Sequence, residues 1–440
     1  MSERTPLLRR RRPAAYRVLV AALLLLFLLV AYRQRREHAL ARAEEQLWTR
    51  NLGTYAPLVP SRVPPLPRGC VVDQVSVLHR HTARYPTSGA AARMRPTLAK
   101  LAHATVPPSA AFLRTADLNM TGWAFGELTE PGREAARNSA HAFAYRLALF
   151  VRSAGSRRVL DTAHLFLSAL GSGSSTISVT IPEGPTVNNT LCVHNCAAQT
   201  SAPAAPEIAS VMHLLSPAAR RLSGLLEIEL TETDIPNIAG MCGYDTARVG
   251  KWSAWCSLLN ATEWEAVGYV SEVARWYGFG GASAGWVNEL VARLNDSLVV
   301  DGTCTNRTLD ADPATFPLGK RLFLDFTHDN EMVAIQAALG ISRHMPTSVS
   351  TVPHREWVLS SVVPFGARWR FERVVCGEER YVRMLVNDRV MPVERPECGG
   401  SLCQLGAFVA SQRESRERDW SACVADRGNL GPRDNDAWVS

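Results

Sequence analysis

Two apolar segments, far apart in the chain, each end in a polar loop that carries histidine. The first segment, Val71–His79, is rich in β-branched residues and leads directly into Arg80–Pro86, which reads RHTARYP. The second segment, Arg321–Phe326, is followed by Thr327–Asp329 and then by an apolar helical pattern over Met332–Leu339. Such apolar runs predict buried strands. Because ligand sites in open α/β sheets lie beyond the carboxyl ends of strands, we expect the two loops to meet at one site.

The composition allows a large core and argues against a nucleic-acid partner. The chain has 440 residues, of which 46% are hydrophobic, so it fits two or three average domains or one large α/β domain with an insertion. The formal net charge is +7, but residues 1–50, with 11 Arg and 4 Glu, supply all of it. Residues 51–440 hold 37 basic and 37 acidic residues, so the body lacks the basic excess that a polyanion requires. The oligomeric state is left open.

Cysteines and glycosylation motifs indicate an oxidising compartment. All ten cysteines follow residue 69, and ten is an even number. Five N-glycosylation motifs accompany them, at Asn119, Asn188, Asn260, Asn295 and Asn306. Free buried thiols in a cytosolic enzyme are the alternative. The combination favours a luminal or extracellular catalytic domain.

The N-terminal region predicts a membrane anchor. Residues 14–32 form a run of nineteen residues in which Arg17 is the one charge, close to the length that crosses a bilayer. The heavier basic flank precedes it, so residues 1–13 are expected to be a cytoplasmic tail of a single-pass type II protein. Within this tail, Glu3–Leu8 (ERTPLL) resembles acidic dileucine signals of endosomal or vacuolar proteins. Residues 33–66, charged and then proline-rich, predict a stalk, and a cleaved signal peptide of a secreted protein is the alternative.

The two histidine loops resemble those of the histidine acid phosphatases, whose signatures are R-H-G-x-R-x-P near the start and H-D near the end. Other segments, in the same order over about residues 68–425, resemble the fungal phytase-like branch: RYPTSG, VRSAGSRRV (151–159), DPATFPLGKRLFLDFTHDNEMVAIQAALG (312–340), VVPFGAR (362–368) and VRMLVNDRVMPV (382–393). The resemblance implies an α/β fold with a phosphoglycerate-mutase-like central sheet, helices on both faces and an inserted α-rich subdomain.

The same resemblance sets the domain boundaries that we expect. The histidine acid phosphatase domain would span residues 67–425, with the α-rich insertion at roughly 90–150 and 200–300. Helical patterns at Arg133–Phe150 and Trp264–Tyr277 fit that insertion. Residues 426–440 would form a flexible tail.

The resemblance implies hydrolysis of phosphate monoesters at acidic pH, without metal or cofactor. His81 would attack phosphorus and form a phosphohistidine, and Asp329 would protonate the leaving oxygen. Guanidinium groups bind phosphate through two parallel hydrogen bonds, so a cationic cluster would hold the small-molecule substrate. The implied substrate-binding residues are Arg80, Arg84, Arg152 and His328. The substrate would be phytate (myo-inositol hexakisphosphate) or a broader range of phosphate monoesters.

The disulfide pairing is likewise implied by the resemblance. Cys70 would pair with Cys376, Cys242 with Cys256, and Cys398 with Cys403. Cys423 would join Cys192 or Cys196, and Cys304 would take the other of these two.

Thr82 departs from the family pattern, which has glycine at this position. If the backbone there requires a positive φ, threonine would be strained and activity reduced. A catalytically weak, glycosylated, membrane-anchored interaction protein of the same fold is therefore the alternative function. A phosphoglycerate-mutase-like transferase shares a histidine-containing opening motif, but we would expect it in the cytosol without disulfides.

Overall fold

The chain forms two compact units in the computed structural model, residues 1–47 and 48–440. The structure describes residues 14–141, 143, 149–171, 177–184, 187–192, 205–279, 285–300, 305–341, 355, 357–392, 398 and 400–413. Helix α1 spans Ala14–Asn51. Among the described residues, no helix combines the length and apolar character needed to cross a membrane, so the anchor predicted at residues 14–32 lacks structural support. The tails predicted at residues 1–13 and 426–440 lie outside the described residues.

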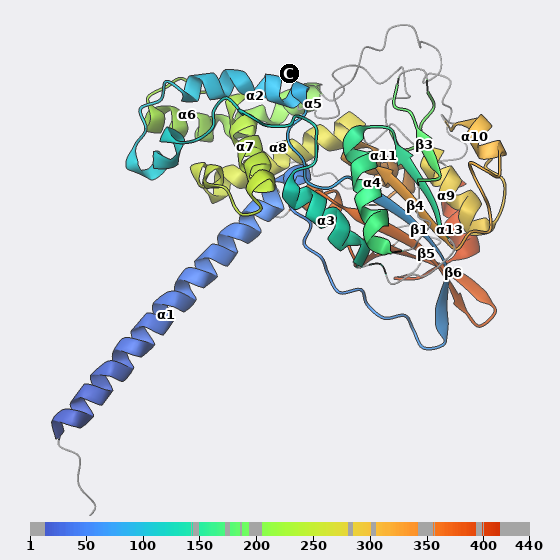
Figure 1. Cartoon of the computed structure of the whole chain (residues 1–440), viewed down its shortest axis with the longest axis horizontal. Helices are drawn as coiled ribbons and strands as arrows, with labels where there is room; N and C mark the ends of the chain where they lie inside the picture. The colour runs from blue at the N-terminus through green and yellow to red at the C-terminus, as the bar shows by residue number, and fades with distance from the viewer. Residues whose placement is uncertain are drawn as a thin grey trace, which may run out of the picture. The chain divides into compact units, whose positions relative to one another are not determined.

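A mixed eight-stranded sheet forms the centre of the second unit (Figure 1). Its main strand order is β3-β2-β4-β1-β5-β6-β7, and β8 pairs with β6. The strands are β1 (Cys70–Arg80), β2 (Leu149–Ala154), β3 (Val179–Ile181), β4 (Leu322–Thr327), β5 (Arg368–Cys376), β6 (Glu379–Val386), β7 (Arg389–Met391) and β8 (Cys403–Gln404). The two predicted strands, β1 and β4, are parallel neighbours, and Arg80 pairs with Thr327 at their carboxyl ends. Both histidine loops therefore leave the sheet at the same edge.

Helices cover both faces of this sheet. Phe326 of β4 packs against Phe166 of α4 (Arg157–Leu170), with ring centroids 5.6 Å apart. The preceding residue, Asp325, accepts a 2.8 Å hydrogen bond from the Trp286 indole of α9 (Gly285–Asn295). Because successive strand residues point to opposite faces, α4 and α9 lie on opposite sides. The predicted α/β architecture is confirmed.

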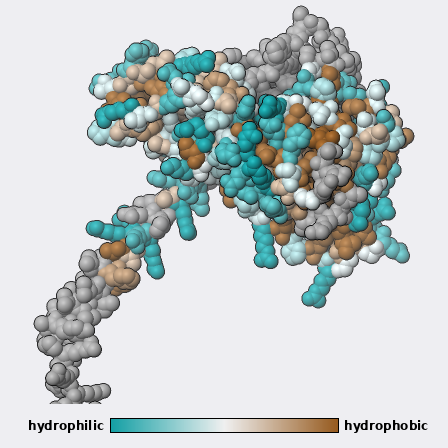
Figure 2. Space-filling model, in the orientation of Figure 1, coloured by the Kyte–Doolittle hydropathy of each residue, from teal (hydrophilic) through white to brown (hydrophobic). Residues whose placement is uncertain are grey.

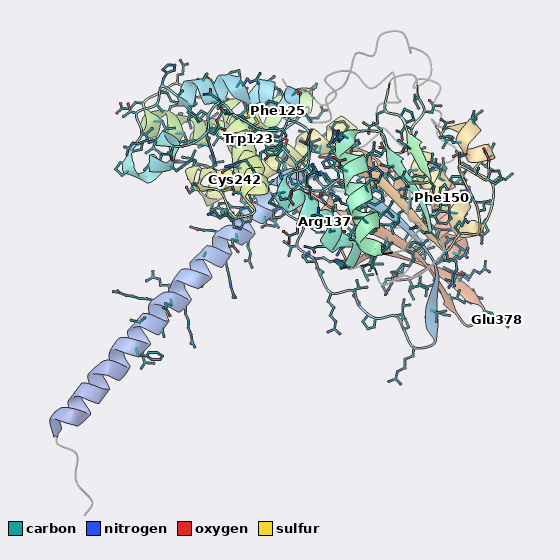
Figure 3. All side chains as sticks on the ribbon, in the orientation of Figure 1. Trp123, Phe125, Arg137, Phe150, Cys242 and Glu378 are labelled. Carbon is teal, nitrogen blue, oxygen red and sulfur yellow. A yellow bond between two sulfur atoms is a disulfide. The ribbon has the colours of Figure 1, made fainter. Side chains whose placement is uncertain are left out.

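A group of helices lies beside the sheet (Figure 1). Helix α7 (Asp234–Val249) packs against α2 (Ser88–Leu101), α6 (Ser216–Leu226) and α8 (Ala261–Phe279), and α5 (Ala205–Met212) packs against α8. Short 3-10 helices complete this part: η2 (Pro108–Arg114), η4 (His213–Leu215) and η5 (Ala254–Leu258). In Figure 3, Trp123, Phe125 and Cys242 lie among these helices, whereas Phe150 lies in the sheet. The remaining described elements are η1 (Gly53–Tyr55), α10 (Arg307–Ala311), α11 (Asp329–Leu339), α12 (Leu359–Val362) and α13 (Leu405–Ser411).

The predicted helical pattern Arg133–Phe150 is not one helix. Helix α3 covers Glu130–His141, and Phe150 belongs to the buried central strand β2. Helix α3 packs against α4, and α9 lies on the sheet, so both belong to the sheet body rather than to the insertion. The buried residues of α3 recur every three or four positions, and its outward face is hydrophilic, as Figure 2 shows.

Residues 48–56 do not form part of a stalk, contrary to the prediction for residues 33–66. Leu52, Tyr55 and Ala56 are buried. The ring of Tyr55 lies 4.6 Å from that of Tyr244 and 6.2 Å from that of Phe365. The sequence gives no local sign of this burial, because it depends on contacts with residues much later in the chain.

Three of the predicted disulfides are present: Cys70–Cys376, Cys242–Cys256 and Cys398–Cys403. The first joins paired positions of β1 and β5. The pairings predicted for Cys192, Cys196, Cys304 and Cys423 stay predictions, because the last three residues lie outside the described part. Of the five glycosylation motifs, Asn119, Asn260 and Asn295 are exposed, and Asn188 and Asn306 are half-buried.

His79, near the end of β1, is buried as a neutral imidazole. Its Nε2 lies 2.8 Å from the Ser139 hydroxyl, and its Nδ1 lies 2.6 Å from the carbonyl oxygen of Arg80. Burial lowers the pKa of His79 from 6.5 to about 4; the hydrogen bond to Arg80 opposes this shift and the charge of Arg368 adds to it. Protonation of the folded state is therefore unfavourable at mildly acidic pH.

We expect His79 to make the protein less stable as the pH falls. The unfolded chain binds a proton at this residue near pH 6.5 and the folded chain only near pH 4, so stability declines across that window, by up to about 3 kcal/mol. Urea unfolding of the wild type and of His79→Gln between about pH 4 and pH 7 measures this. The variant should show a flatter pH dependence of the unfolding free energy, and parallel curves would contradict the assignment.

Candidate active site

His81 lies at the junction of the two histidine loops. Its backbone N–H donates a 3.1 Å hydrogen bond to the carbonyl of Thr327, which links the end of β1 to the end of β4. The imidazole is buried, and Nδ1 lies 2.9 Å from the carbonyl oxygen of Thr82. Since a carbonyl can only accept, Nδ1 carries the proton and Nε2 carries the lone pair. Nε2 has no hydrogen-bond partner among the described residues.

Positive groups surround this imidazole. Burial, followed by the charges of Arg80, Arg158, Arg84 and His328, holds the pKa of His81 well below its usual value. His81 is therefore neutral at acidic pH and keeps its Nε2 lone pair. A neutral imidazole among guanidinium groups suits attack on an anionic electrophile such as a phosphate ester.

Arg80 is fixed by backbone acceptors and an aromatic ring. Its Nη1 donates to the carbonyl oxygens of Thr54 and Val363, the latter at 2.8 Å, and its guanidinium carbon lies 4.6 Å from the centre of the Phe365 ring. Its Nη2 lies 3.3 Å from Oδ2 of Asp329. The structure thus places Asp329 beside an arginine that immediately precedes His81.

Asp329 is the first residue of α11, and His328 is the residue that caps this helix. Besides Arg80, Arg275 of α8 lies near the carboxylate, with Nη1 3.8 Å from Oδ2. The carboxyl group is buried. Asp329 therefore lies at the carboxyl edge of the sheet, with its negative charge compensated by two guanidinium groups.

The loop after His81 is supported by helix α3. The carbonyl of Ala83 accepts a 3.1 Å hydrogen bond from the Thr129 N–H. Gly132 packs so closely on this loop that a Cβ atom there would lie 1.9 Å from the Ala83 oxygen, so the position requires glycine. Arg84, in the same loop, is buried and donates a 2.9 Å hydrogen bond from Nη1 to the Tyr85 carbonyl.

Thr82 is not among the described residues that have a positive φ. Its N–H donates a 3.2 Å hydrogen bond to Oγ1 of Thr162 in α4. The glycine with positive φ in this region is Gly366, at +73°, and the Thr82 methyl group packs beside it. The backbone strain considered for Thr82 is therefore absent.

His328 lies against His81, with the two ring centroids 5.6 Å apart. Its Nε2 is 2.8 Å from Oε1 of Glu183, and its Nδ1 is 3.3 Å from Nη2 of Arg158. Neither Glu183 nor Arg158 was singled out from the sequence. Arg158 lies in the first turn of α4, which follows β2 at the same edge of the sheet.

Comparisons with known proteins agree with this geometry. The family description "Histidine phosphatase superfamily (branch 2)" matches residues 71–387. Phytase A of Aspergillus fumigatus is 33% identical over 403 residues, which cover 82% of this chain and 86% of the relative. Phytase A of Aspergillus terreus is also 33% identical, over 81% of this chain and 86% of the relative. The chain belongs to branch 2 of the histidine phosphatase superfamily.

Solved structures of a phytase and of an inositol polyphosphate phosphatase share the fold. The phytase from D. castellii superposes with a TM-score of 0.69 at 22% identity, covering 87% of this chain and 88% of that one. The multiple inositol polyphosphate phosphatase of Bifidobacterium longum, in complex with inositol hexasulfate, gives a TM-score of 0.56 at 14% identity, over 81% and 96% of the two chains.

Arg152 has a different environment from the one expected for a residue that binds substrate. Its guanidinium donates to both oxygens of Asp325, at 2.8 and 2.9 Å, and to Glu289 at 2.5 Å. Burial lowers the pKa of Arg152, but the charges of Asp325 and Glu289 outweigh it and hold the pKa well above its usual value. Arg152 lies within β2, whereas Arg158 follows the end of that strand, so Arg158 is the arginine of this segment that reaches His81 and His328.

We expect Arg158→Ala and Arg152→Ala to fail in different ways. Loss of Arg158 removes charge beside His81, so kcat/KM on p-nitrophenyl phosphate should fall about 100-fold or more with little change in Tm. Loss of Arg152 leaves Glu289 buried without its cation and Asp325 paired with Arg293 alone, so stability should fall by about 3–5 kcal/mol. Steady-state kinetics and urea unfolding measure the two effects.

Arg157→Ala is the matched control, because its side chain is 73% exposed and forms a surface ion pair with Asp161. It should change stability by less than about 1 kcal/mol. A stable Arg152→Ala protein that lacks activity would instead place Arg152 at the substrate.

Proposed function

We propose that this protein hydrolyses phosphate monoesters, phytate among them, at acidic pH through a phosphohistidine on His81. The observation that carries this proposal is the neutral imidazole of His81, whose Nε2 lone pair lies among guanidinium groups. Its Nδ1–H is held by the Thr82 carbonyl, so the tautomer is already the one that attacks. Membership of the family supports a phosphate ester as the bond that is broken, and the geometry of the site supports His81 as the group that attacks it.

In the first step the substrate phosphate binds to the cationic cluster of Arg80, Arg84, Arg158 and His328. Nε2 of His81 attacks phosphorus, a bond forms between them, and the ester P–O bond breaks. The leaving oxygen takes a proton from the Asp329 carboxyl group, since an alkoxide is a poor leaving group. The alcohol departs and a phosphohistidine remains.

In the second step water attacks the phosphohistidine. The Asp329 carboxylate accepts a proton from this water, the P–N bond breaks, and inorganic phosphate leaves. Asp329 is then protonated again and Nε2 has its lone pair back, so the cycle closes. Arginine side chains compensate the phosphate charge throughout both steps.

Acidic operation follows from the proton that Asp329 must carry. Arg80 and Arg275 lie close to its carboxylate before substrate binds. A bound phosphate competes for the Arg80 guanidinium and adds negative charge, and both effects favour protonation of Asp329. Low pH supplies that proton.

Phytate is proposed as a substrate because curated relatives at 33% identity are named Phytase A. The alternative, a catalytically weak interaction protein, was based on backbone strain at Thr82. Thr82 is unstrained, and His81, Asp329, Arg80 and His328 lie together, which favours hydrolysis. Three disulfides and exposed glycosylation motifs support catalysis in an oxidising luminal or extracellular compartment.

His81→Ala should abolish turnover. The full chain, produced in an oxidising host, is assayed on phytate and p-nitrophenyl phosphate over about pH 3–7. We expect the variant to lose at least about 1,000-fold in kcat, because it lacks the Nε2 atom that would form the covalent intermediate. His164→Ala, at an exposed histidine of α4, is the control and should retain activity. Equal turnover by wild type and His81→Ala would end the nucleophile assignment.

Asp329→Asn should make the rate depend more strongly on the leaving group. Alkyl esters such as glycerol phosphate need the proton, so their hydrolysis should fall by about 100- to 10,000-fold. p-Nitrophenolate leaves without a proton, so the rate of phosphohistidine formation from p-nitrophenyl phosphate should fall far less. The hydrolysis of the phosphohistidine should still slow, because the introduced amide cannot accept a proton from water. Rapid-mixing experiments should then show a burst of p-nitrophenol. The same loss on both substrates without a burst would contradict the role of Asp329.

A further inference from the structure

A carboxylate lies unexpectedly close to the cationic cluster that binds phosphate. Glu183 follows strand β3, and its side chain is 15% exposed. Its Oε1 accepts a 2.9 Å hydrogen bond from the Ser156 N–H at the start of α4 and lies 2.8 Å from Nε2 of His328. One carboxylate oxygen thus connects the ends of three elements: β3, α4 and α11.

A negative charge at this position repels a bound phosphate, so the presence of Glu183 here indicates another role. Burial raises the pKa of Glu183, but the charge and hydrogen bond of His328, together with Arg158 and the Ser156 N–H, hold it well below its usual value. Glu183 is therefore ionised throughout the acidic range in which the enzyme would work. His328 and Arg158 are the charged groups that face it.

The carboxylate determines which nitrogen of His328 carries a proton. Because a carboxylate only accepts, Nε2 of His328 donates to it, and Nδ1 of the same ring lies 3.3 Å from Nη2 of Arg158. An incoming phosphate offers the Arg158 N–H groups a charged acceptor. When Arg158 turns to the phosphate, the hydrogen bond to Glu183 keeps the His328 ring in place.

We propose that Glu183 is a positioning residue whose carboxylate holds Nε2 of His328 and thereby fixes the orientation of this ring between His81 and Arg158. The charged groups around His328 are Glu183 and Arg158, and the neutral His81 ring lies beside it. A carboxylate behind a functional histidine typically orients the ring and raises its basicity, and its removal costs about 10- to 100-fold in function.

This proposal rests on the proposed function, so its test includes phosphate binding as well as turnover. Glu183→Gln keeps the size of the side chain and an oxygen that can accept from the Ser156 N–H, but removes the charge. We expect kcat/KM on p-nitrophenyl phosphate to fall about 10- to 100-fold, and inorganic phosphate to bind about 10-fold more weakly in calorimetry. The Tm should stay close to that of the wild type, because the oxygen that accepts from the Ser156 N–H is kept.

Two further variants separate positioning from folding. Glu232→Gln removes another carboxylate that accepts from a serine, Ser216, in the helical part, and should leave activity and phosphate binding unchanged. In Glu183→Ala, added formate should restore part of the activity, whereas chloride at the same ionic strength should not.

The outcomes are distinct. Unchanged kcat/KM and phosphate affinity in Glu183→Gln, or losses that a lower Tm accompanies and that formate does not rescue in Glu183→Ala, would overturn the proposal. A wild type that binds phosphate but hydrolyses no ester would overturn the proposed function instead. In that case phosphate titration of Glu183→Gln still decides the role of Glu183.

Discussion

The parallel pairing of β1 with β4 is the constraint on which the whole site depends. It aligns the ends of two strands that are far apart in sequence, and the His81 N–H to Thr327 carbonyl hydrogen bond extends the pairing into the loops. Strand β2 continues the parallel arrangement on the other side of β4, which brings the start of α4 to the same edge. Each functional side chain then needs only a short loop or a single helical turn to reach the others. A shift of one residue in the β1–β4 register would point alternate side chains to the other face and separate the groups.

Concentrated positive charge is the main electrostatic difficulty of this site, and the surrounding structure compensates it. Arg80 is balanced by two backbone carbonyls, the face of Phe365 and the carboxylate of Asp329. Further inside the sheet, Asp325 accepts from Arg152, Arg293 and Trp286, a buried network that ties β2, β4 and α9 together. These two arrangements have different roles. In the inner one, Asp325 is paired with two arginines and helps to hold the strands in place, whereas the outer one includes His81, whose Nε2 has no hydrogen-bond partner among the described residues. A buried polar atom without a partner is costly, and a bound ligand can supply what is missing.

The sequence predicted the parts of the site that follow strands and could not predict the parts set by tertiary contacts. His81 and Asp329 were expected because the two loops that carry them, each directly after an apolar strand, resemble the histidine acid phosphatase signatures. Arg152 was expected at the substrate because the segment VRSAGSRRV resembles a phosphate-binding segment of the family, and the sequence does not show where β2 ends. Had the end of the strand been located at Ala154, Arg158 would have been the better candidate. Glu183 gave no local signal, because its role depends on three elements meeting in space.

The fold was predicted to the same extent and for the same reasons. The central strands and α8 follow from periodicity, but the helical pattern at residues 133–150 ran past the true end of α3 at His141. Residues 48–56 read as part of a linker because their apolar side chains are few and lie close to prolines. Residues 51–56 are buried against residues later in the chain, as the packing of Tyr55 on Tyr244 and Phe365 illustrates. Propensity sets which elements can form, and contacts distant in sequence decide where they end.

Thr82 shows how a departure from a family motif can be neutral for chemistry. The site uses the backbone of this residue: its carbonyl holds the Nδ1 proton of His81, and its N–H donates to Thr162. Neither interaction depends on the absence of a side chain, and φ at this position is not positive. The methyl group requires space, which the neighbouring Gly366 provides, because a Cβ atom at Gly366 would lie only 3.3 Å from it. Since Gly366 has a φ of +73° and its N–H donates to the His81 carbonyl, it meets both a conformational and a steric need. Threonine at residue 82 thus depends on glycine at residue 366, and together they keep the backbone around the His81 imidazole in place.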